Sequence, residues 1–253
     1  MLGESLTTDE FIEAVKRLNG FYAAVVERKD SVFAVVDHTR SIPLFYGQKA
    51  GQVYLSDDAY WVRDQLGETE YERLAEIEFS LCGYVTGPDT LHATLKQLQA
   101  GEALHIEVAA GGPVLQPIRY YRRIYGNVWH ASVEELCEAH EEVLKQATAR
   151  MLKQANGRCL CLPLSAGRDS RLIAMMLRRA GYDNVQTFTY GRPENNAEAD
   201  GSRQVAEQLG FRWRLVPYSH RQWYDWFRTP ERQAFYRLAD GVCSLPHIQD
   251  WPA

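Results

Sequence analysis

A strand pattern that runs through a loop of small residues into a helix pattern constrains this chain more than any other feature. An apolar run over 159–164 ends, and a helical run over 172–177 begins, around the loop Leu164-Ser165-Ala166-Gly167-Arg168-Asp169-Ser170. Small residues at such a turn let backbone N–H groups approach an anion, and the N-terminus of the helix adds about half a unit of positive charge. The segment therefore predicts a phosphate-binding loop.

Strand and helix patterns alternate through the second half of the chain. Strands are predicted over 158–164, 185–190 and 211–217, and Gly181 and Gly210 mark the ends of the intervening helices. Strands that alternate with helices predict a parallel sheet with right-handed crossovers, which is an α/β fold. Ligands bind beyond the carboxyl ends of the strands in such sheets, and the loop lies at one of these ends.

The loop does not match a Walker A sequence, because no Gly-Lys-Ser/Thr follows a four-residue spacer. The hydroxyls of Ser165 and Ser170 can donate to phosphate oxygens, and Gly167 permits close approach or a positive φ. Asp169 could act through Mg²⁺, or as an acceptor that fixes the N–H groups of the loop itself. An ordinary tight turn is the alternative, and the strand–loop–helix context favours nucleotide binding over it.

The first half of the chain is rich in predicted strands. We expect a short helix capped by Thr8, a hairpin over 20–36, strands over 43–46, 52–56 and 101–108, and helical structure over 59–80. Gly111-Gly112-Pro113 breaks the pattern. After the boundary stretch 118–130, Ser132 and Glu135 have the spacing of a capping box, and an amphipathic helix follows with the stripe Val133, Leu136, Cys137, Val143, Leu144, Ala147 and Met151.

Composition and charge exclude several classes of function. The net charge of −5 gives no support for a nucleic-acid or membrane partner, and no window approaches the ~18 apolar residues of a membrane-spanning helix. Residues 1–9 are polar and acidic, unlike a secretory signal. The five cysteines form no CxxC pair, so we expect a cytoplasmic protein in which Cys159 and Cys161 are buried thiols of a strand. Aromatic residues over 223–236 favour a helix that covers the sheet.

The loop resembles the SGGxDS pyrophosphate loop of the N-type ATP pyrophosphatases. The stretch 185–217 is similar to the second unit of the asparagine synthetase domain, which contains such a loop. The blocks 19–23, 37–46, 55–57 and 98–102, with Asp37-His38-Thr39-Arg40-Ser41-Ile42-Pro43-Leu44-Phe45-Tyr46 the longest, are similar to the class II glutamine amidotransferase domain of the same family. The resemblance to the asparagine synthetase family covers nearly the whole chain.

This resemblance implies a fold and a domain order. The first domain would be an Ntn-type α/β/β/α sandwich, and the second a partial Rossmann-like parallel sheet of the adenine nucleotide α-hydrolase type. A degenerate amidotransferase-like domain would span 1–118, a linker 119–131, and the N-terminal part of an asparagine synthase-like ATP pyrophosphatase domain 132–253.

The resemblance also implies an activity, a nucleotide and site residues. The parent protein would be an ATP-dependent carbon–nitrogen ligase that uses ATP and Mg²⁺ to adenylate a small-molecule carboxylate, releases pyrophosphate, and joins the acyl group to an amine, as in asparagine biosynthesis. The loop would hold pyrophosphate, with Asp169 as the candidate Mg²⁺ ligand. Thr187, Phe188 and Tyr190 would flank the adenine, Asp240 and Ser244 could line the substrate pocket, and no residue is assigned to catalysis.

Three departures from the family pattern modify these expectations. A working amidotransferase domain begins with a nucleophilic Cys, whereas this chain begins Met1-Leu2-Gly3, so we expect no glutaminase activity. Ala166 replaces a glycine of the motif, which a negative φ would allow. No acidic Gly-Asp-Gly segment follows, so we expect a fragment whose three-stranded sheet has an open edge and an uncovered face. A catalytically inactive relic that binds nucleotide or a partner protein is the alternative, and a homodimer is one assembly open to such a chain.

Overall fold

The computed structural model describes residues 7–126, 128–239 and 241–248, and the chain forms two compact units. The first consists of Met1–Gly126 with Pro230–Ile248, and the second of Asn127–Thr229 with Gln249–Ala253. Residues 132–253 are predicted from sequence as one domain, yet Pro230–Ile248 packs with the first unit.

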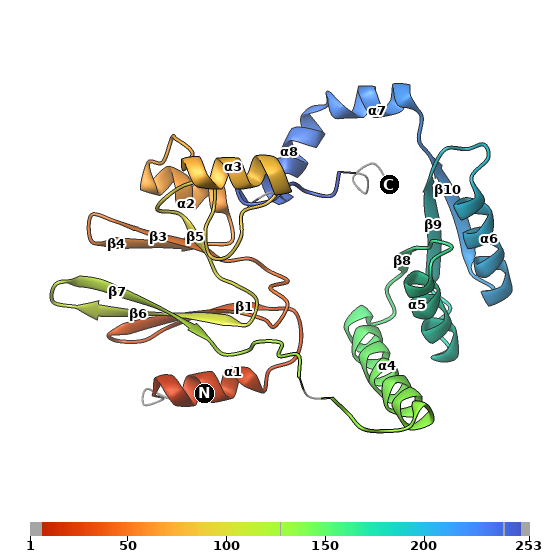
Figure 1. Ribbon diagram of the computed structural model, residues 1–253, viewed down its shortest axis with the longest axis horizontal. Coiled ribbons are helices and arrows are strands. Elements are labelled where there is room, and N and C mark those ends of the chain that lie inside the picture. Colours follow the sequence, from red (N-terminus) through yellow and green to blue (C-terminus); the bar gives the residue numbers. More distant parts are fainter. Residues whose placement is uncertain (1–6, 127, 240, 249–253) are drawn as a thin grey trace. The chain divides into compact units, whose positions relative to one another are not determined.

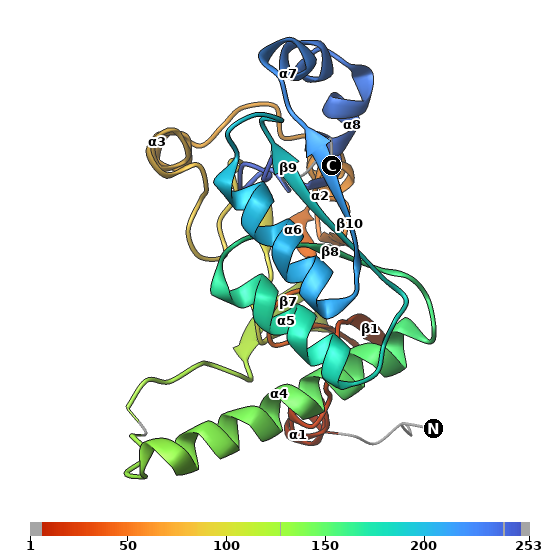
Figure 2. The same ribbon diagram turned by 90° about the vertical axis from the view of Figure 1, so that its right-hand side faces the viewer.

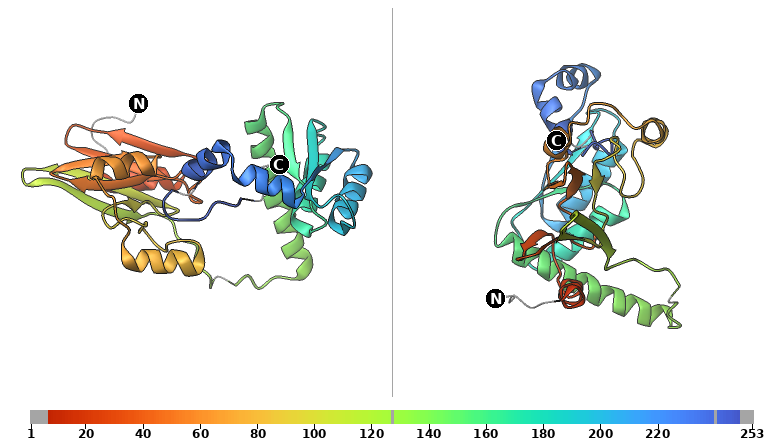
Figure 3. Two further views of the ribbon diagram at one scale, coloured as in Figure 1. Left: turned by 90° about the horizontal axis from the view of Figure 1, so that it is seen from above. Right: turned by 90° about the vertical axis from the view of Figure 1, so that its left-hand side faces the viewer.

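Two antiparallel sheets form the centre of the first unit (Figure 1). One has the strand order β1-β2-β6-β7, with β1 at Ala23–Glu27, β2 at Ser31–Val36, β6 at Glu102–Ala109 and β7 at Gly112–Arg119. The other has the order β4-β3-β5, with β3 at Phe45–Lys49, β4 at Gln52–Ser56 and β5 at Lys96–Gln97. The tip of the β6–β7 hairpin projects past β1 (Figures 1 and 3). The helices are α1 at Thr8–Lys16, α2 at Ala59–Leu66, α3 at Arg73–Cys82 and α8 at Pro230–Ala239.

The apolar side chains of this unit build four layers, α/β/β/α. Phe11 of α1 packs against Phe33 on one face of the first sheet. Val36, on the other face, joins a cluster with Tyr46 of the second sheet. Val62 of α2 packs with Phe45 on the outer face of that second sheet. The α/β/β/α sandwich predicted from the sequence is therefore present in this unit.

Three local expectations for this unit were wrong in detail. Residues 59–80 form two helices, because Gly67 ends α2 in the left-handed conformation at φ 68°. The expected break at 111–113 begins strand β7 instead, and Pro113 is tolerated there because β7 is an edge strand. Thr7, and not Thr8, caps α1 through a capping box with Glu10.

The second unit contains the predicted parallel sheet. Its strands have the order β10-β9-β8, with β8 at Leu160–Pro163, β9 at Val185–Gly191 and β10 at Arg212–Pro217. The helices are α4 at Val133–Ala155, α5 at Arg168–Arg179, α6 at Ala197–Leu209 and α7 at His220–Phe227. Helices α5 and α6 lie side by side on one face of the sheet (Figure 2), where Leu164, Ala174 and Ala206 share a core.

Side chains on the opposite face of this sheet remain accessible. Cys161 and Pro163 of β8, Gln186 of β9 and Arg214 of β10 are all exposed. Cys159 and Cys161 are free thiols, but both are exposed, so the expectation that they are buried was wrong. The reason is that α5 and α6, with Leu152 of α4, pack on the other face. No helix within the described residues is long and apolar enough to cross a membrane.

Candidate functional site

Leu164, the residue that joins strand β8 to the Ser165–Ser170 turn, has both of its backbone polar groups hydrogen-bonded. Leu164 is only 2% exposed, and its N–H donates to the carbonyl oxygen of Phe188 at 2.8 Å. Its own carbonyl oxygen accepts from the hydroxyl of Thr189 at 2.6 Å. The loop therefore starts from a residue that is held in place at the carboxyl end of strand β8. Ligands of α/β proteins bind at this edge of the sheet.

Two serine hydroxyls organise the loop itself. The Ser170 Oγ accepts from the backbone N–H of Ser165 at 3.0 Å and lies 2.9 Å from the Ser165 Oγ. The Ser165 Oγ in turn accepts from the N–H of Gly167 at 3.1 Å. Ser165 and Ser170 were predicted as a pair of phosphate donors, and the fold brings them into contact. Both are half-buried, so their hydroxyls sit at the floor of the turn.

The N-terminus of α5 opens onto this loop. Gly167 is the N-cap, and because it has no side chain it makes no capping hydrogen bond to the first-turn N–H groups of α5. The N–H groups of the first turn are thus available to an anion, which the helix dipole also favours. Gly167 has φ −67°, so it does not use the positive φ considered above. A glycine is needed here for lack of space, because a Cβ at position 167 would lie 3.0 Å from the Ser165 Oγ.

Ala166 fits the loop because a glycine faces it. Its φ lies outside the left-handed region, which is the condition under which the methyl group was expected to be tolerated. A Cβ built on Gly201 of α6 would lie only 3.0 Å from the Ala166 Cβ. The methyl group of Ala166 therefore occupies the space that a side chain at position 201 of α6 would need.

The charged side chains of the loop divide into two kinds. Arg171 is half-buried, and its Nε donates to the carbonyl oxygen of Gly167 at 2.8 Å, so it holds the turn. Arg168 and Asp169 are exposed at the start of α5. Within residues 7–126, 128–239 and 241–248, no three His, Cys, Asp or Glu side chains could hold a metal ion together. A single carboxylate suits Mg²⁺ that is bound mainly by phosphates, and Asp169 fits that arrangement.

A buried polar cluster that we did not predict from the sequence supports the loop from below. The Thr189 and Ser202 hydroxyls are 2.5 Å apart, and the indole N–H of Trp213 donates to both, at 3.1 and 3.2 Å. Thr189 also holds the carbonyl of Leu164. The one trace in the sequence is the pair of threonines at alternate positions of the strand, Thr187 and Thr189.

The three candidate adenine neighbours do not share one face of β9. Thr187 points to the helix-covered side, is 2% exposed, and donates to the carbonyl of Arg212 at 2.9 Å. Phe188 and Tyr190 alternate with it and are half-buried on the other face. The ring of Tyr190 stacks on Tyr218, with centroids 5.1 Å apart. Any adenine contact from Thr187 would thus come from its backbone.

Of the two candidate pocket residues, Asp240 falls outside the described residues. Ser244 belongs to the first unit, where it forms an isolated antiparallel bridge with Tyr84.

Comparison with known proteins places a family on the same segment. Residues 139–232 match the family model described as asparagine synthase, which is a little over a third of the chain and contains the loop and all three parallel strands. The match gives this segment an asparagine synthase-type domain. A search of curated proteins found no match.

Two solved structures are similar to the chain at low identity. One is a glutamine phosphoribosylpyrophosphate amidotransferase from B. subtilis in complex with ADP and GMP, at 13% identity and a TM-score of 0.33, covering 88% of this chain and 41% of that one. The other is described as the allosteric regulatory enzyme of purine biosynthesis, at 12% identity and a TM-score of 0.33, covering 88% and 40%. The chain thus spans about two fifths of their length, and matches at this TM-score carry no argument about function.

Proposed function

We propose that the second unit binds the phosphates of ATP at the Ser165–Ser170 loop, and that the protein is an asparagine synthase-like, ATP-dependent carbon–nitrogen ligase. One observation carries this proposal. The contacting hydroxyls of Ser165 and Ser170 lie beside an uncapped helix N-terminus at the carboxyl end of a parallel strand. That combination supplies neutral donors and a positive dipole, and the segment that matches the family model contains it.

The residues of the loop would act by position and charge. When bound, ATP supplies an activated α-phosphorus for a substrate carboxylate and a pyrophosphate leaving group. The hydroxyls and the first-turn N–H groups of α5 stabilise the charge of that leaving group. Asp169 would hold Mg²⁺ against the phosphates, and Arg171 keeps the turn closed through Gly167. The buried Thr189 cluster keeps Leu164, and hence the loop, in place.

The proposal includes no glutaminase activity for residues 1–253. The first cysteine of the sequence is Cys82, at the end of α3, and Cys243 is buried with its thiol donating to the amide oxygen of Gln97. In this proposal the amine that completes the amide bond is taken up directly. Release of glutamate from glutamine by this chain would contradict this part of the proposal.

Calorimetric titration of the 253-residue chain with ATP and Mg²⁺ tests the site. Ser165→Ala and Ser170→Ala each remove a donor to a charged oxygen, so each should weaken MgATP binding by about tenfold or more. Asp169→Asn should weaken binding only when Mg²⁺ is present. Ser219→Ala, which removes the N-cap of α7 in the same unit, is the matched control and should bind as the wild type does.

Two outcomes would overturn the assignment. One is wild-type affinity in the Ser165 and Ser170 variants, and the other is no measurable binding of MgATP to the wild-type chain. Binding without ATP–pyrophosphate exchange in the longest available form of the protein would instead favour the inactive nucleotide-binding relic.

A further inference from the structure

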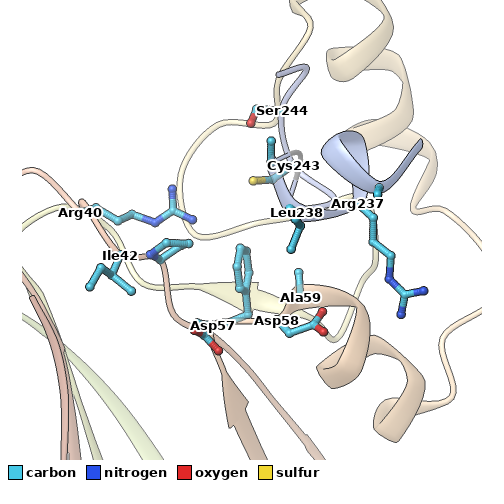
Figure 4. A pocket seen from close by; sticks show the side chains of 14 residues that line it. Arg40, Ile42, Asp57, Asp58, Ala59, Arg237, Leu238, Cys243 and Ser244 are labelled. Carbon is cyan, nitrogen blue, oxygen red and sulfur yellow. The ribbon is translucent and has the colours of Figure 1, made fainter. Parts of the chain in front are cut away.

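A pocket of the first unit, remote in sequence from the phosphate loop, has the size of a small-molecule site. Its volume is about 730 Å³, and its walls come from residues 40–45, the start of α2, and residues 234–239 and 241–244 (Figure 4). Small-molecule pockets in proteins typically fall in this range of volume. All of its walls belong to one compact unit. The proposed ligase function does not use this pocket.

Arg40, on one wall, has a backbone conformation that arginine rarely adopts. Its φ is 57°, in the left-handed region that favours glycine. The Asp37 carboxylate enforces this turn, since its oxygens accept from the N–H groups of Thr39 at 2.8 Å and Ser41 at 3.0 Å. Backbone strain that is held in place by its surroundings is typical of ligand sites.

The half-buried side chain of Arg40 leaves one of its donors without a partner. Its Nε is buried and has no hydrogen-bond partner, and among the described residues the guanidinium makes no ion pair. Its guanidinium carbon lies 5.6 Å from the centre of the Phe45 ring. Figure 4 shows the group directed into the pocket, toward the segment that carries Cys243 and Ser244. A buried charged donor without an acceptor is costly, and an anion from outside would remove that cost.

The other walls limit what that anion can be. Much of the surface is apolar, from Ile42, Pro43, Phe45, Ala59 and Leu238. Asp57 and Asp58 lie on the side opposite Arg40 (Figure 4), and Asp58 is already engaged in capping α2. Arg237 also lines the pocket, but its guanidinium carbon lies 5.4 Å from the centre of the Tyr60 ring, so its charge is already placed over an aromatic face. Two carboxylates across from Arg40 disfavour a polyanion such as a phosphate ester. We propose that this pocket binds a small monocarboxylic acid with an apolar body, whose carboxylate pairs with Arg40.

Phenylacetate, phenylacetamide and phenyl phosphate are suitable probes, titrated into the 253-residue chain and followed by NMR. Phenylacetate should shift the amide signals of residues 40–45 and 57–59. The uncharged phenylacetamide should bind at least about tenfold more weakly, because it cannot form the charged pair. Phenyl phosphate should also bind more weakly than phenylacetate.

Arg40→Gly separates binding from folding. Glycine adopts a φ of 57° without strain, so this variant should unfold at the same temperature as the wild type or higher, while phenylacetate binding falls about tenfold or more. Arg40→Gln should lose binding equally. Arg17→Gln, at the end of α1 and outside the pocket, is the matched control and should bind normally. Wild-type affinity in either Arg40 variant, tighter binding of phenyl phosphate, or no binding of phenylacetate up to its solubility limit would overturn the proposal.

Discussion

Asp37 illustrates at the residue scale how one carboxylate can fix a loop. Its oxygens accept from the N–H groups of Tyr22, Thr39 and Ser41 and from the Thr39 hydroxyl, at 2.7–3.1 Å. Burial opposes ionisation, but these hydrogen bonds outweigh it and hold the pKa of Asp37 below its usual value. The conformation of Arg40 therefore depends on a charged Asp37.

The lowered pKa predicts how the first unit responds to acid. Because the folded-state pKa of Asp37 lies below its unfolded value of about 3.9, its contribution is fully present above that value and is lost as the pH falls through the folded pKa. Asp37→Asn should destabilise the unit by about 1–3 kcal/mol at pH 7 and reduce the acid dependence. Urea titrations at pH 7, 4 and 3, read from NMR amide signals of β1 and β2, measure both effects. Asp30→Asn, in an exposed turn, serves as the control; an unchanged acid dependence in Asp37→Asn would contradict the assignment.

The sequence pattern draws attention to the residues of the loop but not to the residues that support them. Ser165 and Ser170 stood out because small polar residues between a strand and a helix have few other uses. The Thr189, Ser202 and Trp213 cluster could not be found this way, because its members come from three different elements and each is unremarkable in its own stretch. Whether these three side chains come into contact depends on how α6 packs on the sheet. Hydrophobic periodicity along the sequence does not determine that packing.

At the scale of elements, the contact between the loop and α6 is specific enough to test. Glycine within a helix is less favourable than alanine by about 1 kcal/mol, so Gly201→Ala should stabilise α6 where there is space. The Ala166 Cβ, 3.0 Å from the new methyl group, removes that space. We expect Gly201→Ala to be neutral or destabilising in the wild type and stabilising by up to about 1 kcal/mol in Ala166→Gly.

Chemical unfolding of the four proteins in this double-mutant cycle measures the coupling directly. Only neighbouring sites couple by more than about 0.5 kcal/mol, so additive effects would show that the loop does not press on α6 in solution. The same cycle can be read from MgATP affinity, since a displaced loop would misalign Ser165. Ala166→Gly alone should fold, because it restores the glycine that the related loops carry.

Periodicity predicted the regular elements well and their packing less well. The hairpin of β1 and β2 and the parallel strands agree with the sequence pattern, because apolar alternation and glycine positions are local properties. Helix α4 has the predicted capping box, but its apolar stripe remains largely accessible, with Val133 70% and Val143 60% exposed. An amphipathic pattern predicts a helix with an apolar face, and does not say what covers that face.

At the scale of the whole molecule, the segment Pro230–Ile248 belongs to a different unit from the one that its place in the sequence suggests. It follows the parallel strands in the chain, but it packs with the first unit, where the N–H groups of Val85 and Leu91 donate to the carbonyls of Cys243 and Val242 at 2.7 and 2.9 Å. Those hydrogen bonds join residues more than 150 positions apart in the sequence, and no local sequence pattern predicts them. The walls of the Arg40 pocket depend on this return of the chain.

Hydrophobic clusters in the described residues each lie within a single unit. The clusters around Phe33, Leu104, Val62 and Val85 belong to the first, and the cluster around Leu164 to the second. Cores that share no side chains can open independently. A ligand bound at the loop should therefore stabilise the second unit without stabilising the first.

Hydrogen exchange with and without MgATP tests this independence. At a free MgATP concentration 100 times its Kd, amides of β8, β9 and α5 that exchange through opening of the second unit should slow by about a hundredfold, which corresponds to about 2.7 kcal/mol. Amides of β2 and β6 should exchange at an unchanged rate. Ser165→Ala, measured at the same nucleotide concentration, should show a smaller slowing in the second unit. Equal slowing in both units would mean that they unfold together, and slowing confined to the first would place the nucleotide away from the loop.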